Sequence, residues 1–213
     1  MGSLVLVRHS ITAAAAEGRN LGQRGDPPLA EEGVALAERL AIALVAELRE
    51  LVHTDLRVVS SPALRCRQTV APVLAAIGVD PGRMEVVPAL IELAYGAWEG
   101  LTADECRRRD PQHRAAWEAD PYEVRCPDGE SGSDVARRSF PVLEEVESWL
   151  AEDRARVAVV VAHNHVNRLR LCAHLGFPMA EYRDRIAQDP AGYSLLTFGG
   201  RTAIIRRLNA PPA

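Results

Sequence analysis

The sequence predicts an α/β fold, a three-layer α/β/α sandwich whose sheet is mostly parallel with an antiparallel edge strand. Apolar runs alternate along the chain with segments whose apolar residues recur at helical spacing. Residues 4–7 and 157–162 are apolar throughout, as expected of strands buried on both faces of a parallel sheet. Residues 193–198 and 202–208 flank Gly199-Gly200, which indicates a terminal hairpin and therefore the antiparallel edge.

The first strand is followed by a glycine-rich loop and then by a long helix. The loop, residues 11–28, has room for only one helical turn, at the alanine run 13–16. Residues 31–51 carry apolar side chains at helical spacing, and Glu31 and Glu32 suit the positive end of the helix dipole. This segment is therefore predicted to be a helix that packs on the sheet.

A second strand and helix follow. Residues 56–59 form a short apolar strand that ends at Ser60-Ser61. We expect Pro62 in the first turn of the next helix, with one of the serines as its cap. The helix should reach about residue 77, with Pro72 as a kink or an early break. After a turn, residues 84–87 are predicted to be a third strand.

Residues 90–132 differ from the rest of the chain because they are polar and interrupted by prolines. We interpret them as a lid-like insertion within a single domain, 1–213, since long insertions of this kind are often functional. Trp98 is expected to pack within this insertion. The run Arg107-Arg108-Arg109 is interpreted either as a solvated helix face or as a basic patch for an anionic substrate.

The last third returns to regular alternation. Residues 133–152 have helical periodicity that Pro141 is expected to disturb. The strand at 157–162 ends at His163, and a helix should follow to about Leu175 and close at Gly176. The exposed edge of the terminal hairpin is a candidate contact for a homodimer.

The overall composition excludes several classes of protein. The net charge of −4 argues against a general nucleic-acid binder. No apolar stretch approaches the length of about 20 residues that spans a bilayer, so we expect no membrane association. The cysteines lack C-x-x-C spacing, which favours free thiols over disulfides or a zinc site, and with the early first strand makes a cytoplasmic enzyme the expectation. They are Cys66, Cys106, Cys126 and Cys172.

Three of the predicted strands end in residues that suit phosphoryl chemistry. Arg8-His9 follows the first strand, Arg65 lies one helical turn beyond the second, and His163 follows the strand at 157–162. Ligands in open α/β sheets sit beyond the carboxyl ends of the strands. Two histidines and two arginines at this edge would form a pocket for a dianionic phosphoryl group, since arginine makes bidentate, charge-assisted contacts.

Several motifs in chain order make the sequence resemble the histidine phosphatase superfamily, in its phosphoglycerate mutase-like branch. Arg8-His9-Ser10-Ile11-Thr12 is similar to R-H-G-x-T, and residues 60–69 match S-S-x-x-x-R-x-x-Q-T. Further matches are Asp26-Pro27-Pro28-Leu29 with Gly33 (D-x-x-L-x-x-x-G), Leu90-Ile91-Glu92 with Gly96-Ala97-Trp98-Glu99-Gly100 (L-x-E…G-x-W-E-G), Gly129-Glu130-Ser131 (G-E-S), and His163 (the late S-H-G histidine).

The resemblance implies a metal-independent phosphomonoester hydrolase, similar to a histidine acid phosphatase, that needs no cofactor and acts on a small phosphorylated metabolite. By this resemblance, His9 is the nucleophile that becomes phosphorylated, and Glu92 is the proton donor to the leaving alcohol. The phosphate-binding set implied by the resemblance is Arg8, Arg65, His163, Asn164 and Gln23. The arginines and His163 also belong to the implied catalytic set.

The chain departs from the family pattern at three places. Ser10 replaces a glycine, Ala14-Ala15 stands where an asparagine is common in the mutases, and Asn164-His165 replaces two glycines. These departures affect the leaving-group side of the pocket, so the substrate stays open. Three alternatives remain at this point. They are phosphoglycerate mutase-type transfer, a metallohydrolase that uses His163 and His165 as ligands, and a phospho-ligand binding module without turnover.

Overall fold

The computed structural model describes residues 1–49, 55–200 and 202–212. Its strands are β1 (Gly2–Arg8), β2 (Asp55–Ser60), β3 (Glu85–Val86), β4 (Arg156–Ala162), β5 (Tyr193–Phe198) and β6 (Ala203–Ala210). Its α-helices are α1 (Ala13–Ala16), α2 (Glu31–Arg49), α3 (Leu64–Ile77), α4 (Ala103–Arg109), α5 (Pro111–Ala119), α6 (Gly132–Glu152), α7 (Asn164–Leu175) and α8 (Tyr182–Arg185). Short 3₁₀ turns connect several of these elements.

The strands form one mixed sheet in the order β3-β2-β4-β1-β5-β6. The first four are mutually parallel, and β5 and β6 are antiparallel to their neighbours. β1 and β4 lie side by side with Arg8 opposite Ala162, so both strands end at the same level. The predicted α/β fold, mostly parallel with an antiparallel edge, is confirmed.

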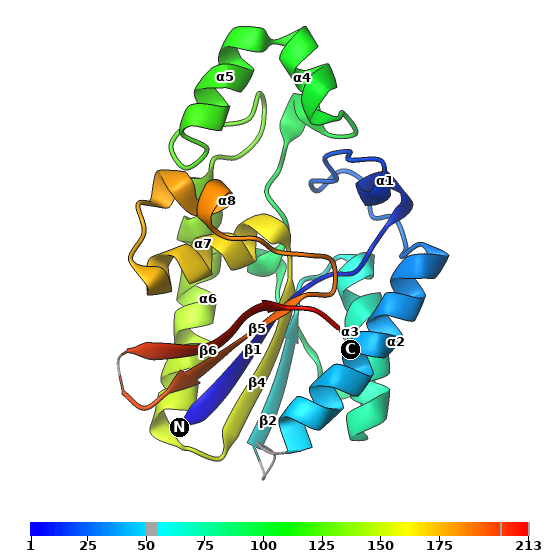
Figure 1. The fold of residues 1–213 in the computed structure, drawn as a ribbon, viewed down its shortest axis with the longest axis vertical. Helices are drawn as coiled ribbons and strands as arrows, with labels where there is room; N and C mark the ends of the chain where they lie inside the picture. The colour runs from blue at the N-terminus through cyan, green and yellow to red at the C-terminus, as the bar shows by residue number, and fades with distance from the viewer. Residues whose placement is uncertain (50–54, 201, 213) are drawn as a thin grey trace.

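Helices cover both faces of the sheet (Figure 1), because alternate side chains of the buried strands point to opposite faces. Leu4 and Leu6 of β1 pack in a core with α6 and α7, whereas Val5 and Val7 pack in a second core with α2 and α3. Each fully buried aliphatic side chain contributes about 1.5–3 kcal/mol to stability. The central strands are therefore fixed from both sides, and so are the residues that follow them.

The start of α3 differs from the prediction. The helix begins at Leu64, after Pro62, and neither Ser60 nor Ser61 caps it. The backbone N–H of Leu64 instead donates to both carboxylate oxygens of Asp26, at 2.7 and 2.9 Å. The prediction that a serine caps this helix is thus wrong. A carboxylate from a loop distant in sequence supplies the acceptor that the helix N-terminus requires.

Neither internal proline ends its helix. α3 continues past Pro72 to Ile77, and α6 continues past Pro141 to Glu152. Both helices bury a continuous apolar face, and this burial offsets the one backbone hydrogen bond that each proline removes. The predicted early break at Pro72 is therefore wrong. Other boundaries shift slightly: the third strand is only Glu85–Val86, and the predicted helix end at 51 lies outside the described residues.

The insertion projects beyond the carboxyl edge of the sheet, with α4 and α5 at its far end (Figure 1). Trp98 and Trp117 are fully buried there, with their rings edge to face and 5.7 Å apart between centroids. The buried thiols Cys106 and Cys126 belong to the same apolar cluster. The expectation that Trp98 packs within the insertion is confirmed, while a lid function stays a prediction.

At one lateral edge of the sheet, β6 is the last strand and exposes Ile204 and Leu208. A homodimer contact at this edge stays a prediction. All four cysteines are free and buried, as their spacing predicts. None of the described helices combines the length and the apolar character needed to cross a membrane.

Candidate active site

A cavity of about 280 Å³ lies at the carboxyl ends of β1 and β4, where ligands bind in open α/β sheets. Its walls come from β1 and the following loop, from α3, from the insertion, and from α7 and α8. The lining residues are Arg8, His9, Ala15, Gly18, Arg19, Asn20, Leu21, Arg65, Glu92, Tyr95, Ala103, Arg114, Asn164 and Arg183. The structure thus brings five predicted site residues into one cavity: Arg8, His9, Arg65, Glu92 and Asn164.

His9 follows β1 directly, and its backbone N–H donates to the Ala162 carbonyl at 3.0 Å. Its Nδ1 lies 2.8 Å from the carbonyl oxygen of Ser10. Because a carbonyl only accepts, Nδ1 carries the ring proton, and the lone pair is on Nε2. Burial and the charges of Arg65 and Arg8 hold the pKa of His9 well below its usual range, so the ring is neutral near pH 7. This is the form of imidazole that can act as a nucleophile.

His163 lies beside His9, with ring centroids 5.2 Å apart. Nη2 of Arg65 donates to Nδ1 of His163 at 3.3 Å, so Nε2 carries the proton and donates to Oγ of Ser61 at 2.7 Å. His163 is fully buried and is not among the residues that line the cavity. In this arrangement it orients Arg65, and its direct contact with a phosphoryl group stays a prediction.

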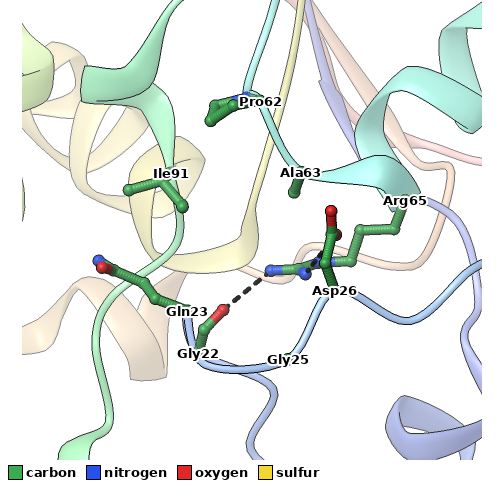
Figure 2. A pocket seen from close by; sticks show the side chains of 8 residues that line it. All are labelled: Gly22, Gln23, Gly25, Asp26, Pro62, Ala63, Arg65 and Ile91. Carbon is green, nitrogen blue, oxygen red and sulfur yellow. Dashed lines mark hydrogen bonds and ion pairs between the residues drawn. The ribbon is translucent and has the colours of Figure 1, made fainter.

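The two predicted phosphate-binding arginines use Nη atoms in their contacts with the protein and leave Nε without an acceptor. Nη2 of Arg65 also donates to the Gly22 carbonyl at 3.1 Å, and Nη1 lies 3.7 Å from the Asp26 carboxylate (Figure 2). Nη1 of Arg8 donates to the carbonyl of Gln188. The Nε atoms of both arginines are buried and have no hydrogen-bond acceptor among the described residues. A buried donor without an acceptor costs about 1–3 kcal/mol, so the site favours an anionic ligand that accepts these hydrogens.

Glu92 has 6% of its surface exposed and faces the same cavity. Its Oε1 accepts from the backbone N–H of Leu93 at 2.9 Å and from that of His165 at 3.3 Å. Burial raises the pKa of Glu92, and the Leu93 hydrogen bond and the nearby arginines oppose this effect only in part. The carboxyl group therefore keeps its proton to a higher pH than an exposed glutamate, as a proton donor should.

Other motif residues hold the loops around the cavity. The Glu99 carboxylate accepts from the backbone N–H groups of Gln23 and Arg24, at 3.0 and 2.6 Å. Glu130 accepts from the backbone N–H of Ala94 at 2.9 Å and from the guanidinium of Arg138. Buried or half-buried carboxylates that accept several hydrogen bonds are strong local anchors. Glu99 therefore fixes the insertion to the loop after β1, and Glu130 fixes it to α6.

The serine that replaces the family glycine is accommodated without strain. Ser10 is fully buried, its Oγ donates to the Gly33 carbonyl at 2.7 Å, and its N–H donates to Oγ1 of Thr69 at 2.9 Å. Gly33 is required at the same contact, because a Cβ there would lie 2.0 Å from the carbonyl oxygen of Ile11. The loop after β1 thus packs closely on α2, and this position has room for a serine hydroxyl.

Gln23 lies at a smaller, neighbouring cavity of about 150 Å³ (Figure 2). Its Nε2 donates to the Glu92 carbonyl at 2.7 Å and to Oε2 of Glu130 at 3.1 Å. The side-chain amide is therefore engaged with the insertion, and Gln23 is not among the residues that line the larger cavity. Its contact with phosphate stays a prediction. Arg65 borders both cavities.

Sequence reasoning missed five polar residues that line the larger cavity, namely Arg19, Asn20, Tyr95, Arg114 and Arg183. The arginine run at 107–109 drew attention instead, but all three of its side chains are exposed and none lines the cavity. Arg114 lies at the fourth position of α5, three residues before the buried Trp117. That spacing places both residues on one helix face, which is the only signal in the sequence that could have found it.

His165 is part of a buried network and not a free ligand. Its Nε2 lies 2.6 Å from the Tyr95 hydroxyl and its Nδ1 lies 2.6 Å from the Tyr182 hydroxyl. Both ring nitrogens are therefore engaged, which disfavours the alternative that His163 and His165 bind a metal together. Among the described residues, no group of three or more His, Cys, Asp or Glu side chains is placed to hold a metal ion.

Comparison with known proteins agrees with this geometry. The chain is 31% identical over 211 residues to phosphoserine phosphatase 1 of Hydrogenobacter thermophilus, covering 98% of this chain and 92% of the relative. It is 35% identical over 180 residues to 6-phosphofructo-2-kinase/fructose-2,6-bisphosphatase of Caenorhabditis elegans, and here the match covers only 35% of the longer relative.

A solved structure of mycobacterial glucosyl-3-phosphoglycerate phosphatase with VO3 has a TM-score of 0.82 to this chain. The two are 28% identical, and the match covers 99% of this chain and 100% of the other. These two relatives, which match this chain nearly end to end, are both named phosphatases. Residues 4–211 match the profile of the histidine phosphatase superfamily (branch 1), and the chain belongs to this family.

Proposed function

We propose that the protein is a metal-independent phosphomonoester hydrolase that acts on a small phosphorylated metabolite through a phosphohistidine at His9. The observation that carries this proposal is the state of His9. Its ring is neutral, its proton is fixed on Nδ1, and no described residue donates a hydrogen bond to Nε2. That nitrogen lies in an arginine-rich cavity beside the buried carboxyl of Glu92.

The reaction proceeds in two steps. In the first, the Nε2 lone pair forms a bond to phosphorus while the phosphorus–oxygen bond to the alcohol breaks, and Glu92 transfers its proton to the leaving oxygen. In the second, water attacks phosphorus, the phosphorus–nitrogen bond breaks, and the Glu92 carboxylate takes the proton of that water. Arg8 and Arg65 neutralise the phosphoryl oxygens in both steps, which is the main demand of phosphoryl transfer.

Hydrolysis is favoured over mutase-type transfer between two substrates. The relatives that match this chain nearly end to end are named phosphatases. Ala14-Ala15, in place of the asparagine common in the mutases, forms part of α1. Ala15 lines the cavity and offers no side-chain hydrogen bond that would retain a second phosphorylated ligand.

Hydrolysis of an aryl phosphate in the presence of excess chelator tests the proposal. We expect wild-type activity to survive chelation and to fall at least about 10⁴-fold in His9→Ala, since the nucleophile is lost. A phosphoenzyme trapped at alkaline pH and lost in acid should be present in the wild type and absent in the variant. His174→Gln is the matched control, because His174 lies at the end of α7 and contacts Glu147 instead of the cavity.

Three results would overturn the proposal. Activity abolished by the chelator would assign the reaction to a metal, and turnover retained by His9→Ala would assign it to another nucleophile. Binding of phosphate esters without any turnover in the wild type would favour the phospho-ligand binding module.

A further inference from the structure

The cavity contains more positive charge than one phosphoryl group requires. Five arginines line it, and Glu92 is the one acidic residue among the lining residues. Arg8 and Arg65 serve the phosphoryl group in the proposed function, and Arg19 is paired with Glu17 and Glu105. Arg114 and Arg183 remain without a role.

Arg114 is a buried guanidinium that is only partly satisfied. Only 3% of the residue is exposed, its Nε donates to Glu118 at 2.9 Å, and its Nη1 is buried with no acceptor among the described residues. Glu118 is half-buried and also pairs with Arg107 on the outer side of the insertion. The ion pair between Nε of Arg114 and Glu118 therefore fixes the guanidinium, and Nη1 can still donate to another acceptor. A buried cationic donor is costly unless an anion accepts its free hydrogen bond.

Arg183 on α8 approaches the same place from a different part of the chain. Its Nε is also buried and has no hydrogen-bond acceptor among the described residues. None of the described carboxylates forms an ion pair with the Arg183 guanidinium. Its guanidinium lies 4.3 Å from a ring centroid of Trp117, and that of Arg114 lies 4.5 Å from it. Stacking on an aromatic ring holds a guanidinium without using its hydrogen-bond donors. Trp117 thus positions both arginines without using Nη1 of Arg114 or Nε of Arg183 as hydrogen-bond donors.

We propose that Arg114 and Arg183 form a second anion-binding subsite in this cavity. The natural substrate is then a small phosphomonoester whose alcohol part carries a second anionic group, a carboxylate or another phosphate. The volume of about 280 Å³ is near the lower end of small-molecule pockets, about 300–1,000 Å³, so one compact metabolite with a phosphate and a second anionic group can reach both subsites. This inference deepens the proposed function and rests on it for the site of phosphoryl transfer.

Matched substrates test the subsite through a ratio. We would measure kcat/KM for ethyl phosphate, for phosphoglycolate, and for ethylene glycol bisphosphate. The first has a neutral alcohol part, the second adds a carboxylate, and the third adds a phosphate. We expect the wild type to prefer an anionic ester by about 10- to 100-fold, the range for hydrogen bonds to charged groups. The better of the two anionic esters identifies the chemistry of the second group.

The variants Arg114→Gln and Arg183→Gln should lower this preference at least about 10-fold, because each removes a charged donor. Arg107→Gln is the matched control, since Arg107 also pairs with Glu118 but is exposed and does not line the cavity. It should leave the ratio unchanged. Equal losses on neutral and anionic esters in the Arg114 and Arg183 variants would indicate a structural role and overturn the inference, as would a wild type without preference.

Binding of non-hydrolysable phosphonates separates this inference from the proposed function. Phosphonoacetate should bind more tightly than ethylphosphonate to the His9→Ala protein, and Arg183→Gln in that background should remove the difference. This result requires no turnover. Tight binding of phosphonoacetate with no His9-dependent hydrolysis would refute the proposed function alone, whereas hydrolysis with equal binding of the two phosphonates would refute the subsite alone.

Discussion

The residues on the sheet and those on the insertion hold their side chains in different ways. On the sheet, Arg8, His9 and His163 follow parallel strands that are paired residue by residue, and main-chain hydrogen bonds fix where each side chain begins. On the insertion, Glu92 and Arg114 stand on short or irregular elements that are fixed by side-chain carboxylates and by packed tryptophans. In the proposed reaction Arg8 and His9 face the phosphoryl group, and Glu92 and Arg114 face the leaving group.

This difference indicates that the two regions have separate functions in the proposed reaction. A sheet buried on both faces supplies rigid positions that suit a nucleophile and its phosphate-binding partners. An insertion held by side chains can change its sequence without disturbing the sheet, which suits substrate selection. Experiments that alter one region at a time can sharpen this comparison or break it.

After loss of the nucleophile His9, the largest effect is expected at Glu92. Glu92→Gln cannot donate a proton, so formation of the phosphoenzyme from an alkyl phosphate should slow about 10²- to 10⁴-fold. The effect on a nitrophenyl ester should be much smaller, since nitrophenolate leaves without protonation. Rapid-quench measurement of the phosphoenzyme checks this, with the exposed Glu123 of the insertion as control (Glu123→Gln). Wild-type rates on the alkyl ester would assign the proton donor elsewhere.

Arg65 should follow. Arg65→Gln removes charge that stabilises the transition state, and kcat/KM should fall about 10²- to 10³-fold for aryl and alkyl esters alike. Arg67→Gln, on the same helix but exposed, is the control and should behave as wild type. A selective loss on one class of ester would place Arg65 on the leaving-group side and contradict the assignment of the sheet residues to the phosphoryl group.

The base of the insertion offers a stability test with a close internal control. Gly96 has φ +57°, and a Cβ there would lie 2.0 Å from the Pro127 carbonyl oxygen, whereas Gly100 has φ +77° with open space around it. Gly96→Ala should lower the free energy of unfolding by about 2–4 kcal/mol, and Gly100→Ala by about 1 kcal/mol. Denaturant unfolding measures both. Equal losses would show that the close contact at Gly96 does not anchor the insertion.

The smallest effect expected is a pH window. The reaction needs a neutral His9 and a protonated Glu92. The pKa of His9 is lowered well below 6.5, the ordinary value for histidine. On the acid side, kcat/KM for an alkyl ester should therefore fall only at a pH well below 6.5. Since the pKa of Glu92 is raised above 4.5, the alkaline fall should begin above that value. Glu92→Gln should lose the alkaline fall attributed to this group, while substrate ionisation stays the same in both proteins. An unchanged alkaline limb would contradict the assignment.

The amino-acid sequence alone was enough to predict the alternation of strands and helices, the mixed sheet, and the gathering of Arg8, His9, Arg65 and His163 at one edge. These inferences succeed because apolar runs and helical periodicity report burial directly, and because parallel strands end at a common edge. Glu92 joins them through the resemblance of its motif and not through any periodicity.

Only the tertiary structure decided what surrounds these residues. Asp26 in place of a serine at the start of α3, the engagement of both His165 nitrogens, and the arrival of Arg114 and Arg183 at one cavity all join segments far apart in sequence. Exposed Arg107 and buried Arg114 look alike in the sequence. What separates them is the packing of Trp117, because burial and hydrogen-bond partners belong to the folded chain and not to local spacing.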